Sequence, residues 1–390
     1  MSPADSKLPV AIFLQRYWGD KMTFVERQLT GLSKDFELSI LTPVDETQGQ
    51  SKRFPIFSKE KNFAEKIYSG LYKKAFSRFT TISLSQSSYW KSLIQNKNIK
   101  LIHAHFGPAG VQVLPLAKKC GISLLVSFHG YDASKLLEDK IYLSNLKELF
   151  GYEKLHIICV SEYMKKKLLS AGAPSGRITI NYYGIPLEEF QFVKRESPLE
   201  KIKSGKTVKF LQIANFQEKK GHLYTVKAFR KLLDRQPNCT LTLAGSGPLK
   251  DEIESLCKSE AIGEKVFFPG AVSVKDVFSF LENHDIFVHH SITGSSGDQE
   301  GIPNAIIEAM ATAMPAISTY HAGIPELIED GLSGFLVNEK DIDSYYKKME
   351  AALSLDDQMG LNAYEKVKKD FNLSKQVEKL KVLYSSLILE

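Results

Sequence analysis

The chain has 390 residues, of which 43% are hydrophobic and 25% charged, and this balance is typical of a globular protein large enough for two cores. Its four cysteines show no CxxC spacing, which argues against a zinc site or a disulfide framework. No apolar run reaches the roughly 18 residues of a membrane span, and no basic segment precedes an apolar signal sequence at the N-terminus. We therefore expect a cytoplasmic protein.

The net charge of +6 conceals a difference between the two halves of the chain. Residues 1–185 contain 26 Lys and Arg against 15 Asp and Glu, a net charge of +11, whereas residues 186–390 contain 25 against 30, a net charge of −5. The first half is thus expected to meet an acidic partner. Nucleic acid is not expected in that role, because no nucleic-acid-binding motif accompanies the charge.

Short apolar runs alternate with longer amphipathic segments along the chain. This alternation predicts βα repeats and two doubly wound parallel sheets. The strands predicted for the first sheet are residues 10–14, 38–42, 101–106, 124–128 and 157–161, and those for the second are 209–214, 241–245, 266–270, 286–290 and 316–320. Residues 186–206, which contain Pro198 and several charges, are predicted to be the linker between the two sheets.

The densest positive charge lies in the first half, around a predicted amphipathic helix at residues 63–79. The basic residues of this region are Lys52, Arg53, Lys59, Lys61, Lys66, Lys73, Lys74 and Arg78, against only Glu60 and Glu65. Apolar and aromatic residues recur at helical spacing, so the predicted helix has one apolar face and one basic face. Two interpretations remain open: the helix lies in an anionic membrane interface, or it packs on its own domain with a solvated lysine face.

Polar residues follow two predicted strands of the first sheet, at the carboxyl ends where ligands of such sheets bind. In SFHGYD, His129 precedes Gly130, which lets the backbone approach a ligand, and Asp132 could bind a hydroxyl group. In HAHF, His103 and His105 fall on one face of a strand. No third ligand at a suitable spacing accompanies them, so a metal site is not expected.

The run from residue 298 to 337, DQEGIPNAIIEAMATAMPAISTYHAGIPELIEDGLSGFLV, is the most informative part of the chain. Glu308 follows Glu300 by eight residues, with Pro303 suited to the first turn of a helix between them. The free amides of that helix N-terminus favour a phosphate. Eight helical residues span roughly 12 Å, so two carboxylates could hold the two polyol ends of a nucleotide-sugar while the amides hold its diphosphate.

The pattern E-x7-E followed by EAMA, an apolar strand and GIPELI resembles the donor-site signature of the family 4 retaining glycosyltransferases. The segments GDQEGIPN and HAGIPELIEDGLSGFLV are similar to the exopolysaccharide and colanic-acid branch of that family. The resemblance implies an α/β protein of the GT-B fold, with two doubly wound Rossmann-like domains facing a central cleft. Residues 1–185 would form the acceptor-side domain, with the C-terminal helix 372–390 crossing back to it, and residues 186–371 the domain that binds the nucleotide-sugar donor.

The resemblance also implies a role for each matching donor-site residue. Glu308 is expected to bind the ribose hydroxyls, Glu300 the sugar hydroxyls, and Lys220 the negative charge that develops on the leaving diphosphate. The other donor-binding positions implied in this way are Asn215, Gly247, Val272, Gly301, Ile302, Pro303 and Asn304, of which residues 301–304 meet the diphosphate. In the first domain, His129 is expected to contact the transferred sugar, and His105 and Asp132 are candidates for contacts with the acceptor.

One motif departs from the family pattern. In ANFQEKKGH, Lys220 and Gly221 match G-R-L-x-x-x-K-G, but Asn215 stands at the arginine position and Ala214 at the first glycine. This departure removes one fixed positive charge from the leaving-group site. Lys219, or an arginine from elsewhere in the chain, could compensate for it.

We therefore predict a retaining enzyme that moves a hexose-type sugar from a nucleoside diphosphate, with UDP favoured, to a glycan or lipid-linked oligosaccharide in surface polysaccharide assembly. No cofactor or metal is expected, and Asp341 of the D-x-D at 341–343 is predicted to cap a helix. The protein would act in the cytoplasm or at the inner face of the cytoplasmic membrane. Two alternatives remain: a sugar-nucleotide epimerase of GT-B shape, whose acid and base groups this sequence does not match, and a non-catalytic glycan-assembly subunit, which Asn215 favours.

Overall fold

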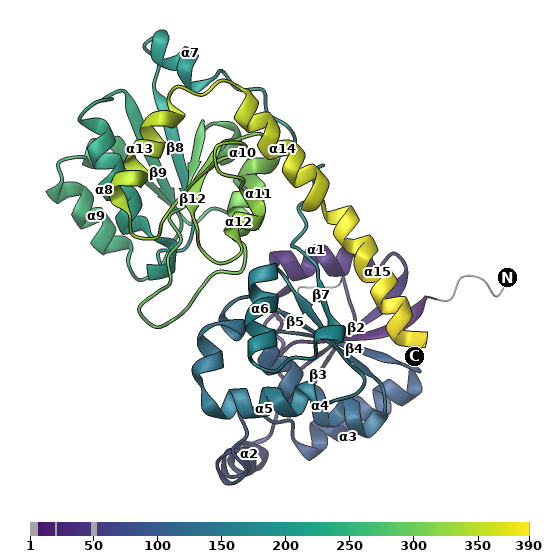
Figure 1. The fold of residues 1–390 in the computed structure, drawn as a ribbon. Coiled ribbons are helices and arrows are strands. Elements are labelled where there is room, and N and C mark those ends of the chain that lie inside the picture. Colours follow the sequence, from purple (N-terminus) through teal and green to yellow (C-terminus); the bar gives the residue numbers. More distant parts are fainter. Residues whose placement is uncertain (1–6, 20–21, 48–52, 390) are drawn as a thin grey trace. The chain divides into compact units, whose positions relative to one another are not determined.

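The computed structural model describes residues 7–19, 22–47 and 53–389 and divides into two compact units. The first unit comprises Met1–Gly184 with Leu373–Glu390, and the second comprises Ile185–Asn372 (Figure 1). Lys52, one of the basic residues noted in the sequence, lies outside the described residues.

A parallel seven-stranded sheet forms the centre of the first unit, in the order β3-β2-β1-β4-β5-β6-β7. Its strands are β1 (Leu8–Phe13), β2 (Phe36–Thr42), β3 (Ile56–Ser58), β4 (Leu101–His105), β5 (Ser123–Phe128), β6 (Leu155–Cys159) and β7 (Ile178–Ile180). The helices of this unit are α1 (Thr23–Leu32), α2 (Phe63–Ala75), α3 (Leu84–Asn96), α4 (Gly107–Cys120), α5 (Lys140–Phe150), α6 (Glu162–Ser170) and α15 (Leu373–Leu389).

The second unit is built on a parallel six-stranded sheet in the order β10-β9-β8-β11-β12-β13. Its strands are β8 (Val208–Ile213), β9 (Cys239–Ala244), β10 (Val266–Gly270), β11 (Ile286–Val288), β12 (Ala316–Thr319) and β13 (Phe335–Val337). Its helices are α7 (Pro198–Lys203), α8 (His222–Leu233), α9 (Lys250–Ser259), α10 (Val277–Glu282), α11 (Asn304–Ala311), α12 (Ile324–Leu327), α13 (Ile342–Ala352) and α14 (Gln358–Asp370). The predicted α/β class with two doubly wound sheets is confirmed, and Asp341 caps α13 by accepting a bond from the Ser344 N–H.

The segment predicted to be a linker, residues 186–206, is instead part of the second unit. The Arg195 guanidinium donates hydrogen bonds to the carbonyl oxygens of Leu281 and His284 and to the Thr312 hydroxyl. Pro198 is buried at the start of α7. The charges in this stretch predicted solvent exposure, but an arginine with five donors can satisfy several backbone acceptors at once and so hold a segment against its domain.

The structure of α2 does not agree with the interpretation that this helix packs its apolar face on its own domain. Its apolar residues face solvent rather than packing on the domain: Phe63 is 80% exposed, Leu71 64% and Ile67 52%. The capping box of Asn62 and Glu65 closes its N-terminus, since each side chain accepts a hydrogen bond from the other residue's backbone N–H. Among the described residues of α2, only Ser69 is buried.

The C-terminal helix α15 packs on the first unit (Figure 1). Val377, Leu380, Tyr384 and Leu387 join the core formed around β1, β2 and α1. The Tyr384 hydroxyl lies 2.6 Å from His103 Nδ1 on β4, and the Ser123 hydroxyl donates to the Leu387 carbonyl at 2.7 Å. The last helix is therefore part of the core of the first unit.

Tyr384→Phe should lower the free energy of unfolding by about 1–3 kcal/mol, because it leaves a fully buried His103 nitrogen without its partner. Chemical denaturation followed by circular dichroism measures the change. The matched control is Tyr68→Phe on the exposed side of α2, for which we expect a change within about 0.5 kcal/mol. Equal stability of the two variants would contradict the proposed importance of this contact.

Candidate active site

In both sheets the strand order reverses at one place, and the candidate site is expected at that reversal. The chain passes from β1 outward to β3 and then returns to β4 on the other side of β1; in the second sheet β8 and β11 stand in the same relation. Ligands of open α/β sheets bind at the carboxyl ends of the strands at such a reversal. The relevant positions are therefore the residues that follow β1, β4, β8 and β11.

A lysine pair and two carboxylates meet beyond β8 in the second unit. Lys220 Nζ lies 2.8 Å from Glu300 Oε1, and Lys219 Nζ lies 3.0 Å from Asp298 Oδ2 and 3.8 Å from Glu300 Oε1. Burial alone would raise the pKa of Glu300, but the charges of Lys220 and Lys219 lower it to about 2. Glu300 is therefore a carboxylate at neutral pH, and the predicted pair Lys220 and Glu300 are direct neighbours.

A histidine and a further glutamate hold the backbone of Glu300. The Glu300 N–H donates to His321 Nε2 at 3.1 Å, and His321 Nδ1 lies 2.6 Å from Glu339 Oε1. Because Nε2 accepts a bond, the proton of the neutral ring is on Nδ1 and is donated to Glu339. The Thr293 N–H donates to the other oxygen of Glu339 at 2.7 Å. The sequence did not predict His321 and Glu339 as site residues, although His321 stands in the HAGIPELI motif.

Two glycines allow the loops of this site to approach one another. Gly221, with φ of +62°, ends the Lys220 turn and is the N-cap of α8, and a Cβ there would lie 1.7 Å from the His290 carbonyl oxygen. Gly247, with φ of +150°, follows β9, and a Cβ there would lie 2.7 Å from Phe216 backbone atoms. Neither position accepts a side chain. Gly247, predicted to bind the donor, thus packs against the loop that leads to Lys220.

Helix α11 begins at Asn304, and Pro303, predicted to lie in the first helical turn, is its N-cap. The predicted phosphate-binding residues Gly301, Ile302 and Pro303 are buried in the turn before it. Pro303 makes no side-chain cap hydrogen bond, and of the amides in the first turn that of Ile306 donates to the Pro303 carbonyl. Glu308 is half-buried one turn further along α11.

Buried polar atoms without a hydrogen-bond partner concentrate around this edge of the second sheet. In the described part of the chain they include atoms of Gln212, His222, His289, His290, Ser291, Asp298 and Asn304. Such atoms are rare in folded proteins because each costs desolvation energy. Their clustering favours a site for a polar ligand. His289 was not predicted; burial, with Lys220 as a smaller cause, holds its pKa well below the usual value, so its ring is neutral.

The two remaining donor-site predictions lie at the surface of the same unit. Asn215 is exposed directly after β8, and Val272 is half-exposed shortly after β10. Asn215 contributes no charge to the site. Lys219 does lie close to Glu300, a distance that the sequence alone could not predict. Within residues 7–19, 22–47 and 53–389, no three His, Cys, Asp or Glu side chains come together in a way that could hold a metal ion.

The rings of His105, His129 and Tyr183 lie in a row at the carboxyl ends of β4, β5 and β7 in the first unit. His105 Nδ1 lies 3.2 Å from His129 Nε2, and the Tyr183 hydroxyl lies 3.0 Å from His129 Nδ1. Burial, followed by the nearby His105, holds the pKa of His129 well below its usual value, and burial lowers that of His105 to about 3. His129 is partly exposed and His105 is fully buried. Both rings are therefore neutral at physiological pH.

Asp132 supports the loop that carries His129. Its carboxylate accepts hydrogen bonds from the backbone N–H groups of Gly107, His129 and Gly130 at 2.8 to 3.0 Å, and the residue is 2% exposed. The sequence predicted a contact between Asp132 and an acceptor hydroxyl. In the structure the carboxylate is occupied by three amides, so its visible role is to hold the β5 loop against the start of α4.

Two family profiles match the chain. The profile described as Glycosyltransferase Family 4 matches residues 24–189, and the one described as Glycosyl transferases group 1 matches residues 193–370. The first match ends just beyond the boundary between the two units at Gly184, and the second lies wholly within the second unit. None of the helices in the described part of the chain has both the length and the hydropathy needed to cross a bilayer.

Several curated proteins are similar to the chain. The putative colanic acid biosynthesis glycosyltransferase WcaL of Salmonella typhimurium is 27% identical over 94% of this chain and 96% of its own length. Its Escherichia coli counterpart is 32% identical over 69% of this chain and 66% of its own length. The amylovoran biosynthesis glycosyltransferase AmsK of Erwinia amylovora is 32% identical over 61% of this chain and 57% of its own length.

Solved structures establish the fold. HepE of Anabaena, solved in complex with UDP, is similar with a TM-score of 0.75 at 15% identity, over 97% of this chain and 100% of that one. A sucrose-phosphate synthase of Thermosynechococcus elongatus gives a TM-score of 0.75 at 18% identity, over 98% and 100%. The predicted GT-B fold and the resemblance to the exopolysaccharide branch are confirmed. The chain belongs to the GT-B glycosyltransferases of family 4, with a group 1 glycosyl transferase domain in its second half.

Proposed function

We propose that the protein is a retaining glycosyltransferase that moves a hexose-type sugar from a nucleoside diphosphate, preferably UDP, to a glycan or lipid-linked acceptor in the assembly of a surface polysaccharide. The relatives named for colanic acid and amylovoran biosynthesis support the polysaccharide assignment. The observation that carries the chemistry is the contact of Lys220 with Glu300 among unpartnered polar atoms at the sheet edge. This arrangement can bind a diphosphate and a polyol side by side.

Lys220 is proposed to stabilise the charge that develops on the leaving diphosphate. Its ammonium group is held by Glu300 before any ligand arrives, so little reorganisation is needed at the moment of reaction. Lys219, close to the same carboxylate, would supply the second positive charge that Asn215 cannot. The uncapped amides at the start of α11 would bind the same diphosphate, and Glu308 the ribose hydroxyls.

Glu300 is proposed to bind sugar hydroxyls rather than to attack the sugar. A carboxylate with a pKa of about 2 that is paired with a lysine at 2.8 Å is a weak nucleophile. The hydrogen bond from its N–H to His321 fixes the backbone, so the side chain has a defined position. In the proposed retaining reaction a leaving-phosphate oxygen takes the acceptor proton on the same face of the sugar, and no protein nucleophile is required.

His129 is proposed to contact the transferred sugar as a neutral ring. Its pKa lies well below the usual value, so the ring carries no charge, and because both nitrogens are engaged it would meet the sugar through ring carbons or its backbone. Tyr183 and His105 hold its two nitrogens and thus fix the orientation of the ring.

Lys220→Ala should reduce kcat for donor hydrolysis about 10²- to 10³-fold, the loss expected when one group that stabilises transition-state charge is removed. KM should change much less, because the interaction strengthens during bond cleavage. Coupled detection of free UDP measures both constants with UDP-hexoses as donors. Lys227→Ala on α8 is the control and should behave as the wild type.

Three other outcomes would redirect the assignment. A change confined to KM would limit Lys220 to ground-state binding. Epimerised UDP-sugar without release of UDP would favour the epimerase alternative. A wild-type protein that binds UDP-sugar but never cleaves it would favour a non-catalytic subunit.

Stability should fall as the pH is lowered from 7.5 to 5.5. The pKa of His103, His105, His129, His222, His289 and His290 is lowered in the folded protein, chiefly by burial. Below the unfolded pKa of about 6.5 the unfolded chain binds protons that the folded chain does not, so each group costs up to about 1.4 kcal/mol per pH unit. Urea denaturation at the two pH values measures the difference, and greater stability at pH 5.5 would contradict it.

We further propose that α2 brings the enzyme to an anionic membrane surface, where a lipid-linked acceptor would be held. Its exposed residues Phe63, Ile67 and Leu71 present apolar surface, while Lys66 and Lys74 add positive charge. A bilayer with anionic headgroups matches both features of such a helix.

Wild-type protein should therefore sediment with vesicles that contain anionic lipid at low salt, and less so at high salt. Ile67→Asn with Leu71→Asn, and separately Lys66→Glu with Lys74→Glu, should each weaken this binding at least about tenfold. Val382→Asn is the control, since Val382 is 72% exposed on α15. Absence of wild-type sedimentation would refute the membrane proposal and favour a soluble acceptor.

A further inference from the structure

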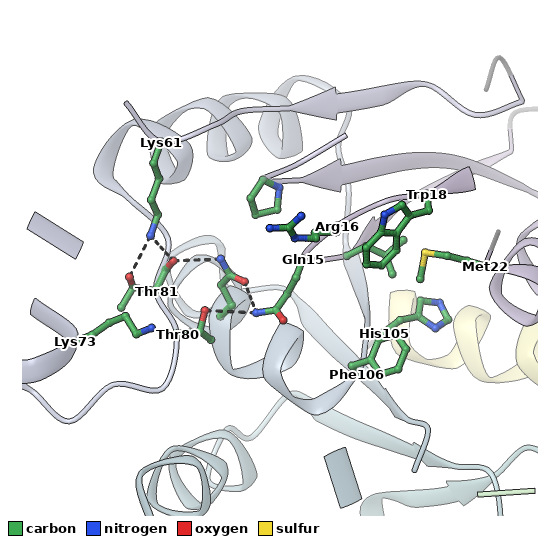
Figure 2. Close-up of a pocket in the computed structure, with 13 residues that line it drawn as sticks. Gln15, Arg16, Trp18, Met22, Lys61, Lys73, Thr80, Thr81, His105 and Phe106 are labelled. Carbon is green, nitrogen blue, oxygen red and sulfur yellow. Dashed lines mark hydrogen bonds between the residues drawn. The ribbon is translucent and has the colours of Figure 1, made fainter. Parts of the chain in front are cut away.

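A pocket of about 400 Å³ lies in the first unit, at the reversal point between β1 and β4 (Figure 2). Its walls come from the residues that follow these strands, from residues 80–81, and from residues near and within α2. Its volume falls in the range of about 300–1,000 Å³ that is usual for small-molecule sites. The pocket thus has both the size and the position expected of a ligand site in this unit.

One end of the pocket is cationic. Lys61 Nζ donates to the Ser69 hydroxyl at 2.9 Å and to the Thr81 carbonyl at 2.8 Å, which are both neutral partners. Lys73 lines the same end, and Figure 2 shows both lysines on the side of Thr81. Burial lowers the pKa of Lys61, and the charge of Lys73 lowers it further. Two ammonium groups that repel each other at the wall of a pocket are stabilised when an anion binds between them.

The nearby carboxylates are already engaged. Glu65, which partly offsets the effect of Lys73 on Lys61, accepts the Asn62 N–H in the capping box of α2. Arg16, a third cation of the pocket wall, pairs with Glu46 at 2.7 Å. Neither Lys61 nor Lys73 forms an ion pair with a described residue within 4.0 Å. The cationic end therefore lacks a close counter-ion within the described chain.

The opposite end is aromatic and lies beside His129 of the same unit. Figure 2 shows Trp18, Met22, His105 and Phe106 together on the side away from the two lysines. Trp18 is 43% exposed and can stack on the apolar face of a sugar ring. Phe106 has φ of +74°, an uncommon conformation for a bulky residue that is found at functional sites.

His105 connects this end to the proposed chemistry. It is fully buried, its Nδ1 bonds to His129, and its Nε2 has no hydrogen-bond partner among the described residues. A buried ring nitrogen that borders a pocket is expected to meet a polar group there. A ligand hydroxyl at this position would lie next to the ring that is proposed to contact the transferred sugar.

A polar wall joins the two ends. The Gln15 side-chain amide donates to Gln112 Oε1 at 2.8 Å, and the Gln112 amide donates to the Thr81 carbonyl at 3.1 Å. The Thr81 carbonyl also accepts the bond from Lys61, so it connects this chain of amides to the cationic end. The wall is thus preorganised before a ligand binds.

We propose that this pocket recognises an acidic acceptor. The sugar that carries the reacting hydroxyl lies at the aromatic end beside Trp18 and His105, and an anionic group of the same acceptor, a carboxylate or a phosphate, binds Lys73 and Lys61 at the other end. The inference rests on the proposed glycosyl transfer and names the class of acceptor. The anionic oxygens belong either to a uronic acid or to the diphosphate of a lipid carrier.

Binding of small acceptor probes tests the proposal without vesicles, so that any role of α2 at a membrane does not enter. The first pair is p-nitrophenyl glucuronide and p-nitrophenyl glucoside, which differ in one carboxylate. The second pair is citronellyl diphosphate glucose and citronellyl glucoside, which differ in the diphosphate. Calorimetry in the presence of UDP measures each dissociation constant, and we expect at least about tenfold tighter binding of the anionic member of one pair.

Lys73→Gln should remove this preference, whereas Lys73→Arg should retain most of it. Lys74→Gln is the matched control, because it removes the same charge from the neighbouring position of α2 but does not line the pocket. Preference within the glucuronide pair alone assigns the anion to a uronic acid, and preference within the diphosphate pair alone assigns it to the carrier.

Equal affinities within both pairs, or equal effects of Lys73→Gln and Lys74→Gln, would overturn the proposal. Donor hydrolysis is measured on the same wild-type preparation. If hydrolysis is absent while the anion preference persists, the proposed transfer fails and the binding site stands; the reverse result rejects the acidic acceptor alone.

Discussion

The contact of Lys220 with Glu300 is the interaction on which the second unit's functional edge depends. A buried carboxylate is costly unless a cation and hydrogen bonds compensate it. Here two lysines supply the charge, and the backbone of Glu300 is fixed by His321, which Glu339 orients. The turn that presents Lys220 must end in a residue without a side chain, because the His290 carbonyl occupies the space of a Cβ at Gly221. The ion pairs of Glu300, the orientation of the His321 ring and the close packing at Gly221 therefore together fix the positions of Lys220 and Glu300.

In the first unit, the histidine side chains near the candidate site are neutral rather than paired as ions. Its rings at positions 103, 105 and 129 are neutral because burial disfavours their protonated forms. Its charge is kept at the surface, in α2 and in the wall of the pocket, where Lys61 and Lys73 stand without a close counter-ion among the described residues. Other cations of this unit, such as Arg16, Arg78 and Lys97, are paired with carboxylates. In the second unit, by contrast, the lysines at the candidate site, Lys219 and Lys220, are themselves paired with carboxylates.

The sequence predicted the long, buried elements well, because a run of apolar residues between turn signals is a strong local pattern. It missed the three-residue strands β3, β7 and β13, although it predicted β11, which is equally short. It also predicted a linker where Arg195 instead anchors the chain to carbonyl groups distant in sequence. Such contacts depend on three-dimensional neighbours that no local pattern encodes.

The same distinction applies to the site. Lys220, Glu300 and His129 could be proposed as site residues because they stand in recognisable motifs. The distances between their side chains and their neighbours could not be predicted from the sequence. His289 and His321 were missed, since a lone histidine after a strand is usually structural, and only its unpartnered nitrogens or its bond to Glu300 identify it. Asp132 shows the reverse case: its motif position indicated a ligand contact, while three backbone amides already occupy its carboxylate.

Asn215 raises the question of how a site retains its charge when one cationic position is lost. The lysine at 219 lies 3.8 Å from the same Glu300 oxygen that Lys220 contacts, and its main partner is Asp298. A carboxylate partner weakens the field of a lysine but also holds it in place, whereas a long unpaired side chain would have to be ordered at each turnover. Binding of a diphosphate would draw Lys219 away from Asp298 with little loss, since one anionic oxygen replaces another. In the proposed site, Lys219 would therefore supply from the same turn the second cation that Asn215 lacks.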